Sequence, residues 1–193
     1  MRLAILDSGH SFRMKALFAF IRAISRLPVP DAVKLNRYRA DFYGTPMRVL
    51  TQIAMRGPSA WSVGDRELMG ASVSQTNGCE VCTKTHAGVA ALAYQDEAKV
   101  STTLADLETA TIEEPLRTTL RMLRKLAREH VVDADDMRAV LAAGVSREQI
   151  EDALAVSFVF NTVDRLSRAF GFVVAGPKAF EAGARFLLAR GYR

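Results

Sequence analysis

The chain has 193 residues and a mass of 21.2 kDa, which is the length of one domain with a modest extension. Hydrophobic residues make up 49% and charged residues 24%, and this excludes a disordered tail protein, a collagen-like fibre and a small disulfide scaffold. The net charge of +5 is unevenly spread, because residues 1–60 hold ten Lys/Arg and only three Asp/Glu. A basic segment of this kind favours an acidic partner or a neighbouring subunit over nucleic acid.

The first apolar run of the chain predicts an amphipathic helix. Residues 16–21 are apolar, but Arg22 ends the run, which is too short to span a membrane and lacks a secretory cleavage site. We expect a basic helix over 14–26 that packs on its own protein, with a membrane-surface anchor as the alternative. The two cysteines, three positions apart, are not a secreted framework, and they favour the cytoplasm.

Helical patterns dominate the rest of the chain, and no strand pattern of useful length occurs, so the expected fold class is all-α. Proline, glycine and capping residues set the expected boundaries, among them the capping box of Ser146 and Gln149. The expected helices cover 14–26, 31–42, 47–55, 64–77, 79–94, 113–130, 133–144, 146–170 and 178–189. We expect an N-terminal helical arm over 1–30, one all-α domain over 31–175 and a C-terminal helix within 176–193.

Two of these helices carry more specific expectations. The stretch 153–160 is apolar on nearly every side, which predicts a fully buried helix. On the helix over 113–130 four arginines fall opposite the apolar stripe, and we expect them to form a solvated face; they are Arg117, Arg121, Arg124 and Arg128.

Chemistry-bearing side chains are concentrated in residues 67–86. On a helix that begins after the Asn77-Gly78 turn, Cys79, Cys82 and His86 share one face. Cys79 would lie in the first turn, where the helix dipole stabilises a thiolate. Cys82 and His86 are one turn apart, so the imidazole could take the thiol proton. Glu67, on the preceding helix, could orient that imidazole.

Each of these residues also has a plainer interpretation. A C-x-x-C pair can be half of a zinc site, but one histidine brings the set only to three ligands, and His10 and His130 have no ligand spacing to it. A lone helical histidine or glutamate is usually a packed or solvated side chain. The joint spacing favours redox chemistry, and no metal or other cofactor is expected.

The run RELM at 66–69, followed by NGCEVCTKTH at 77–86, resembles the carboxymuconolactone decarboxylase family and, within it, the alkylhydroperoxidase D branch. The segments AAGVSREQI at 142–150 and FNTVDR at 160–165 are similar too, so the resemblance spans roughly 30–175. It implies an all-α fold that assembles into homotrimers or homohexamers. It also implies a thiol enzyme that reduces hydroperoxides and is recharged by a dithiol or a lipoyl-bearing protein.

By this resemblance Cys82 is the peroxidatic thiol, Cys79 the resolving thiol, and Glu67 and His86 the proton relay. The best-characterised branch has a histidine immediately before the second cysteine, where this chain has Val81. We therefore expect slower peroxide turnover, or a disulfide or another electrophile as the substrate.

Two other functions stay open at this point. A decarboxylase or lactone enzyme would use His86 and Glu67 as acid and base without the thiols. An interaction module would use the C-x-x-C pair as a metal clip or redox switch. Asn161 and Arg165 match a polar pair of the family, which we interpret as helix-to-helix hydrogen bonding in preference to substrate binding.

Overall fold

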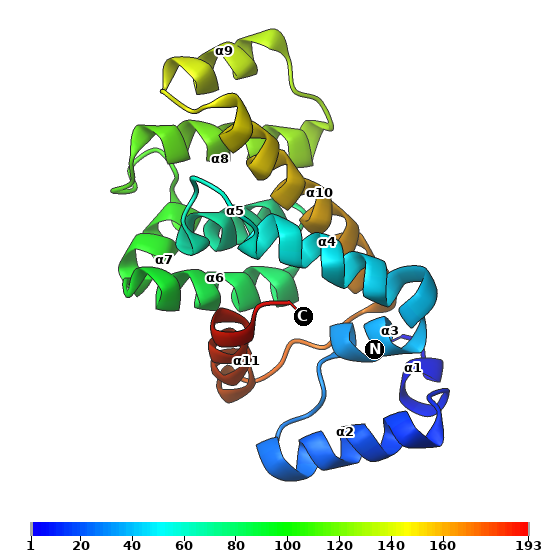
Figure 1. Cartoon of the computed structure of the whole chain (residues 1–193). Coiled ribbons are helices and arrows are strands. Elements are labelled where there is room, and N and C mark those ends of the chain that lie inside the picture. Colours follow the sequence, from blue (N-terminus) through cyan, green and yellow to red (C-terminus); the bar gives the residue numbers. More distant parts are fainter. Residues whose placement is uncertain (1, 193) are drawn as a thin grey trace.

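The computed structural model describes residues 2–192, and every regular element in that range is helical (Figure 1). The elements, including one short π-helical turn, η1, are α1 (Ile5–Ser8), α2 (Phe12–Ser25), α3 (Asp31–Tyr38), η1 (Ala40–Gly44), α4 (Thr45–Arg56), α5 (Val63–Thr76), α6 (Glu80–Tyr94), α7 (Glu97–Ala105), α8 (Glu114–Glu129), α9 (Ala134–Ala142), α10 (Arg147–Phe170) and α11 (Pro177–Arg190). The expected all-α class is confirmed.

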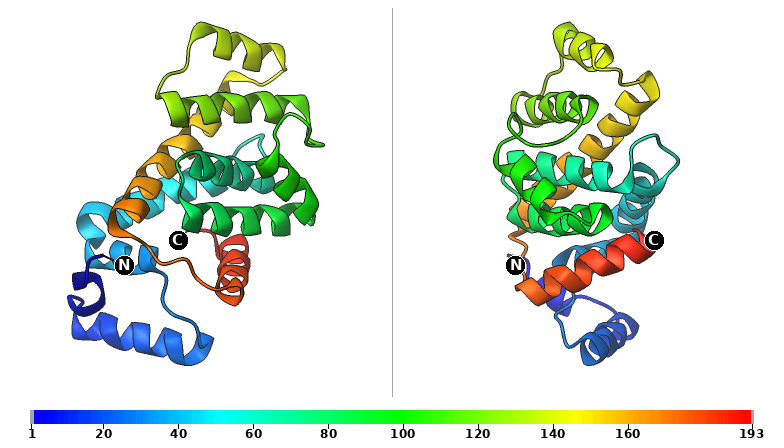
Figure 2. Two further views of the ribbon diagram at one scale, coloured as in Figure 1. Left: turned by 180° about the vertical axis from the view of Figure 1, so that it is seen from behind. Right: turned by 90° about the vertical axis from the view of Figure 1, so that its left-hand side faces the viewer.

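Helices α5 and α6 form the centre of the fold. The long helix α10 contacts α4, α5 and α8, while α11 packs across α6. Figure 2 shows α1, α2 and α3 gathered at one end of the molecule, with α8 and α9 at the other. The elements that hold the candidate site therefore lie between these two ends.

The core lies where α5, α8 and α10 meet. Its largest fully buried apolar side chains include Met55, Leu68, Met69, Leu120, Leu123 and Phe160. Each such side chain contributes about 1.5–3 kcal/mol on burial. This core fixes α5 against α10, and both helices supply residues to the site.

Most helix boundaries agree with the sequence analysis. The capping box of Ser146 and Gln149 begins α10 as expected. A second capping box, formed by Ser62 and Asp65, begins α5. The sequence analysis missed α7, which lies in a stretch for which it predicted no element.

Three expectations were wrong in detail. The 153–160 stretch is not fully buried, because one side of α10 faces outward and Phe158 is 58% exposed. Arg117 and Arg124 are not solvated. The Arg117 guanidinium bonds Ala110 O at 2.6 Å, and that of Arg124 bonds Ser72 Oγ at 2.7 Å and Thr103 O at 3.1 Å. The helix expected over 31–42 ends at Tyr38, and η1 follows it.

The expected packing of the N-terminal helix on its own protein involves few side chains. Helix α2 has no buried side chain, and Phe20 and Ile24 are largely exposed. It contacts the protein through Phe18, whose ring meets the buried ring of His10 edge-on at 4.9 Å.

Within residues 2–192 no helix is both long and apolar enough to cross a membrane.

Candidate active site

The turn between α5 and α6 places both cysteines. Gly78 has a φ of +67°, a left-handed conformation that glycine adopts without strain. The turn reverses the chain, and the Cys79 amide then donates to Ser74 O at 2.9 Å. Cys79 becomes the N-cap of α6, and Cys82 lies one turn further along the same helix.

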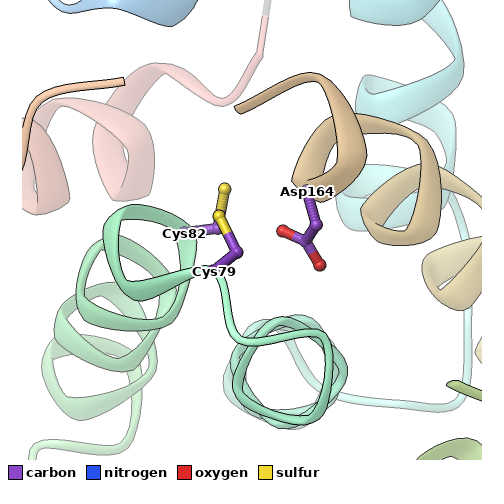
Figure 3. Close-up of side chains that lie close together, drawn as sticks. All are labelled: Cys79, Cys82 and Asp164. Atoms are coloured by element: carbon purple, nitrogen blue, oxygen red, sulfur yellow. The ribbon is translucent and has the colours of Figure 1, made fainter. Parts of the chain in front are cut away.

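Cys79 and Cys82 are free thiols and lie beside a carboxylate. They are only 3% and 6% exposed. Their Sγ atoms and an oxygen of Asp164 all lie within 4.8 Å of one another (Figure 3). Cys82 Sγ also lies 3.6 Å from Ser167 Oγ. Helices α6 and α10 thus enclose a pair of thiols with one acidic group.

The two thiols differ in their electrostatics. The hydrogen bond from the Cys82 thiol lowers the pKa of Cys79. The same bond, together with burial and the Asp164 charge, raises the pKa of Cys82. Burial and the neighbouring Cys82 sulfur raise the pKa of Tyr43, in η1, to about 12. The pKa of Cys79 is therefore the lower of the two, and the cause is the Cys82 thiol, not the start of the helix.

Asp164 is fully buried on α10 and takes its hydrogen bonds from α5. Ser74 Oγ donates to its Oδ1 at 2.9 Å, and Asn77 Nδ2 donates to its Oδ2 at 2.9 Å. Burial raises the pKa of Asp164, and the hydrogen bonds from Asn77, Ser74 and the thiols offset part of this rise.

Glu67 lies at the centre of a second polar cluster. Its Oε2 is 2.7 Å from His86 Nδ1, and its Oε1 is 2.7 Å from Arg56 Nη2. Tyr192, which follows α11, donates to Glu67 Oε1 at 2.8 Å. Elements distant in sequence therefore converge on one buried carboxylate.

The hydrogen bonds of Glu67 determine which ring nitrogen of His86 can act as a base. Because an ionised carboxylate only accepts, His86 Nδ1 carries the proton and neutral His86 is left with Nε2 as its acceptor. Phe160 and Tyr192 hold the ring from two sides, at centroid distances of 4.5 Å and 6.1 Å.

Burial alone would raise the pKa of Glu67. The hydrogen bond from His86, the charges of His86 and Arg56 and the bond from Tyr192 outweigh it, and the pKa lies below its ordinary value. Burial and the Glu67 charge raise the pKa of Tyr192 well above the ordinary tyrosine value. The cluster thus holds an ionised Glu67 against a neutral Tyr192.

The four residues singled out from the sequence all lie on α5 and α6, in two adjacent groups. The expected contact between Cys82 and His86 is not made as a direct hydrogen bond: within the described chain Cys82 Sγ bonds Ser167, and His86 bonds Glu67 and Tyr192.

Sequence reasoning missed Arg56, Asp164, Ser167 and Tyr192. Asp164 stands inside the family-like segment 160–165, but the pair noted there was Asn161 and Arg165. Asn161 does bond across helices, to Asn77 at 3.2 Å, whereas Arg165 is exposed and its side chain forms no hydrogen bond in the range 2–192. No sequence signal marks Arg56 or Tyr192.

Among residues 2–192, a metal ion could bind only at the cluster that holds the two thiols. Within residues 2–192 the one cluster with suitable spacing is Cys79, Cys82 and Asp164. Three ligands fall short of the four that structural zinc takes, and the carboxylate already accepts two hydrogen bonds. The arrangement suits thiol chemistry better than metal binding.

The fold resembles those of several solved structures. One is an uncharacterized peroxidase-related protein from Silicibacter sp. TM1040, with a TM-score of 0.74, 18% identity, and 91% of this chain and 90% of that chain covered. Another, from Ralstonia eutropha JMP134, is described as an alkylhydroperoxidase AhpD core, with a TM-score of 0.74, 17% identity and 92% of each chain covered. The chain has the AhpD-like fold.

Proteins with different activities share the AhpD-like fold. The debrominase Bmp8 matches with a TM-score of 0.68 and 13% identity over 90% of this chain and 92% of that chain. A cysteine-to-alanine variant of it has been solved with 2,3,4-tribromopyrrole. No protein-family profile matches the sequence, and no curated protein matches it. The comparisons therefore establish the fold and leave the activity to be argued from the site.

Proposed function

We propose that this chain is a thiol-dependent peroxidase of the alkyl hydroperoxide reductase type. Its Cys79–Cys82 pair cycles between dithiol and disulfide, and Glu67 and His86 relay protons. The observation that carries the proposal is the placement of two free thiols, one turn apart on α6, against a carboxylate in a buried setting.

In the proposed cycle the Cys82 thiolate attacks the outer oxygen of a hydroperoxide. The S–O bond forms, the O–O bond breaks, and the alkoxide leaves as an alcohol once protonated. The sulfenic acid on Cys82 then condenses with Cys79, with loss of water, to a disulfide. An external dithiol reopens the disulfide by thiol–disulfide exchange.

The assignment of Cys82 as the attacking thiol follows the family resemblance. Because the two sulfur atoms lie within 4.8 Å of each other, one proton can be held by either of them. With the proton on Cys79, Cys82 is the thiolate, and the Ser167 hydroxyl at 3.6 Å stabilises its charge. The variants described below separate this assignment from the reverse one.

His86 makes no direct hydrogen bond to Cys82, so the proposed relay runs through a bridging water or the substrate. Neutral His86 would accept a proton at Nε2, and Glu67 would stabilise the charged ring. We propose that the alkoxide formed on O–O cleavage is the group that this relay protonates.

The burial of both thiols also bears on the substrate. With side chains 3% and 6% exposed, a small hydroperoxide fits the pair better than a protein disulfide, which disfavours a general disulfide reductase. We propose a dithiol or lipoyl-bearing protein as reductant, a homotrimer or homohexamer as the assembly, and the cytoplasm as the compartment, in which the thiols stay reduced.

A decarboxylase-like, non-redox enzyme remains the second candidate, because Glu67 and His86 form an acid–base pair without the thiols. It predicts that both cysteine variants keep full activity on a lactone. A loss of activity in either variant would count against it.

The deciding experiment measures the intact mass of reduced protein after one equivalent of tert-butyl hydroperoxide. We expect the parent to lose two hydrogens rapidly, Cys82→Ser to stay unchanged, and Cys79→Ser to accumulate a trappable sulfenic acid. A sulfenic acid that accumulates on Cys79 in Cys82→Ser, and not on Cys82 in Cys79→Ser, would overturn the roles. An unchanged parent mass would overturn peroxidase activity and direct attention to lactones and brominated pyrroles.

A further inference from the structure

Asp164 is a buried carboxylate without a cationic partner. It is fully buried, and no lysine or arginine in residues 2–192 forms an ion pair with it. Buried carboxylates are normally paired with a cation, because an unpaired buried charge is costly. Here the partners are two neutral donors, Ser74 of α5 and Asn77 directly after it. Such a group is a candidate for proton transfer.

The remaining side of Asp164 faces the thiols. Its carboxyl oxygen and the Sγ atoms of Cys79 and Cys82 lie within 4.8 Å of one another (Figure 3). Other titratable or charged groups near the cluster are Tyr43 of η1, His86 of α6, which bonds Glu67, and Arg168 of α10. Arg168 donates to Asn77 O at 2.7 Å and not to the carboxylate. The thiols are therefore the groups with which Asp164 can exchange a proton.

The charge balance of the cluster supports this role. Two negative charges within 5 Å in a buried setting repel strongly, so the cluster favours a single one. A proton that moves from a thiol to Asp164 leaves that total unchanged, since the charge passes from oxygen to sulfur. The buried site therefore does not have to acquire a second charge when a thiol becomes nucleophilic.

We propose that Asp164 is the acid–base group of the thiol pair. Its carboxylate takes the proton that the second thiol loses when the disulfide closes and then gives that proton to the leaving group. With a sulfenic acid, the S–S bond forms as the S–O bond breaks, and the proton leaves with the hydroxide as water. The alkylhydroperoxidase branch that this chain resembles has a histidine immediately before the second cysteine, where this chain has Val81. Asp164, on α10, would supply a base in place of that histidine. The inference rests on the proposed dithiol–disulfide cycle.

The test uses a probe that closes the pair without a peroxide. Methyl methanethiosulfonate converts one thiol to a methyl disulfide and releases methanesulfinate. The second thiol then displaces methanethiol and forms the Cys79–Cys82 disulfide. Quenched-flow mass measurements follow the decay of the methylthio adduct across pH. Because no hydroperoxide is involved, a negative result here is distinct from the failure of peroxidase activity.

Asp164→Asn should make the thiols more acidic and yet slow the closure of the disulfide. Removing the nearby negative charge should lower the apparent thiol pKa, measured by thiolate absorbance, by about one unit. Removing the base should slow adduct decay about 100-fold at pH values below the thiol pKa. A structural disturbance alone would not make the thiols more acidic and closure slower together. An unchanged thiol pKa with unchanged decay would overturn the proposal.

Two further variants serve as a control and as a substitute for Asp164→Asn. Asn161→Ala alters the same polar cluster without touching a thiol or the carboxylate, and both quantities should stay at the wild-type value. If Asp164→Asn does not fold, Ser74→Ala keeps the carboxylate but removes one hydrogen bond that favours its charged form. The acidic limb of the closure rate should then move to higher pH. An acidic limb that does not move would overturn the proposal.

Discussion

Tyr192 donates a 2.8 Å hydrogen bond to Glu67, a residue 125 positions earlier in the chain. Its amide also donates to Gln52 Oε1 at 2.7 Å, and its ring lies 5.2 Å from the Arg56 guanidinium. The segment after α11 is thereby attached to α4 and to the carboxylate that orients His86. The geometry of the proposed relay depends on this segment as well as on α5 and α6.

Tyr192→Phe should weaken both stability and activity. The variant removes one of the two donors to Glu67 Oε1, and the loss of a hydrogen bond to a charged group should cost about 1.5–3 kcal/mol in the free energy of unfolding. Peroxide reduction should fall about tenfold, the equivalent of 1.4 kcal/mol in the barrier, because the His86 partner is less well oriented. Urea unfolding and stopped-flow peroxide consumption measure the two effects.

Tyr94→Phe is the matched control for that variant. Tyr94 also donates to a carboxylate, Asp65 Oδ1 at 2.5 Å, but at the far end of α6. It should lose similar stability and keep the parent rate. Equal losses of rate in the two variants would show that Tyr192 has no specific effect on the relay.

Glu67→Gln should destabilise the fold in a pH-dependent way. The buried Arg56 guanidinium loses its ion pair, which should cost about 3–5 kcal/mol. The pKa of Glu67 in the folded protein lies below its ordinary value of 4.5. Its charged form therefore contributes stability that is fully present above 4.5 and is lost as the pH falls through the folded pKa.

The measurement for Glu67→Gln is urea unfolding of parent and variant from neutral to acidic pH. The stability gap should be constant near neutrality and narrow only below 4.5. A gap that instead grows as the pH falls would mean that the buried carboxyl group is protonated in the folded protein.

Gly70→Ala should displace the Phe160 ring that packs against His86. A Cβ at Gly70 would lie 2.5 Å from the Phe160 ring, and that ring contacts His86 edge-on. Overpacking of this kind costs about 1–3 kcal/mol, and displacement of Phe160 should lower the peroxide rate. Gly183→Ala on α11 meets nothing within 4 Å and should stabilise the protein by about 0.5–1 kcal/mol. Thermal unfolding with rate assays separates the two, and a stable, fully active Gly70→Ala would contradict the argument.

The sequence was sufficient for the features that depend on local chemistry. The capping box of Ser146, the left-handed turn at Gly78 and the face shared by Cys79 and Cys82 are all set by residues within a few positions. The same local patterns carried the resemblance, and the AhpD-like fold agrees with it.

The remaining features depend on contacts that no local pattern encodes. Asp164 reaches the thiols because α10 packs on α5, and Tyr192 reaches Glu67 because α11 packs across α6. Arg124 resembled a solvated arginine, yet it bonds a carbonyl of α7, the helix that the sequence analysis missed. The sequence predicted most of the helices, but it did not predict which residues would be the hydrogen-bond partners of the buried polar groups.

The exposed side of α10 carries a large apolar side chain, and we expect it to take part in assembly. Phe158 is 58% exposed, and Ile53 on the contacting helix α4 is 62% exposed. The homotrimer or homohexamer stays a prediction, and this apolar side is where we expect copies to meet. Phe158→Asp should dissociate it at micromolar concentration, because burying an unpaired carboxylate costs several kcal/mol. Val131→Asp, at a similarly exposed residue between α8 and α9, should leave the assembly intact. Light scattering tests both variants, and a monomeric parent would refute the prediction.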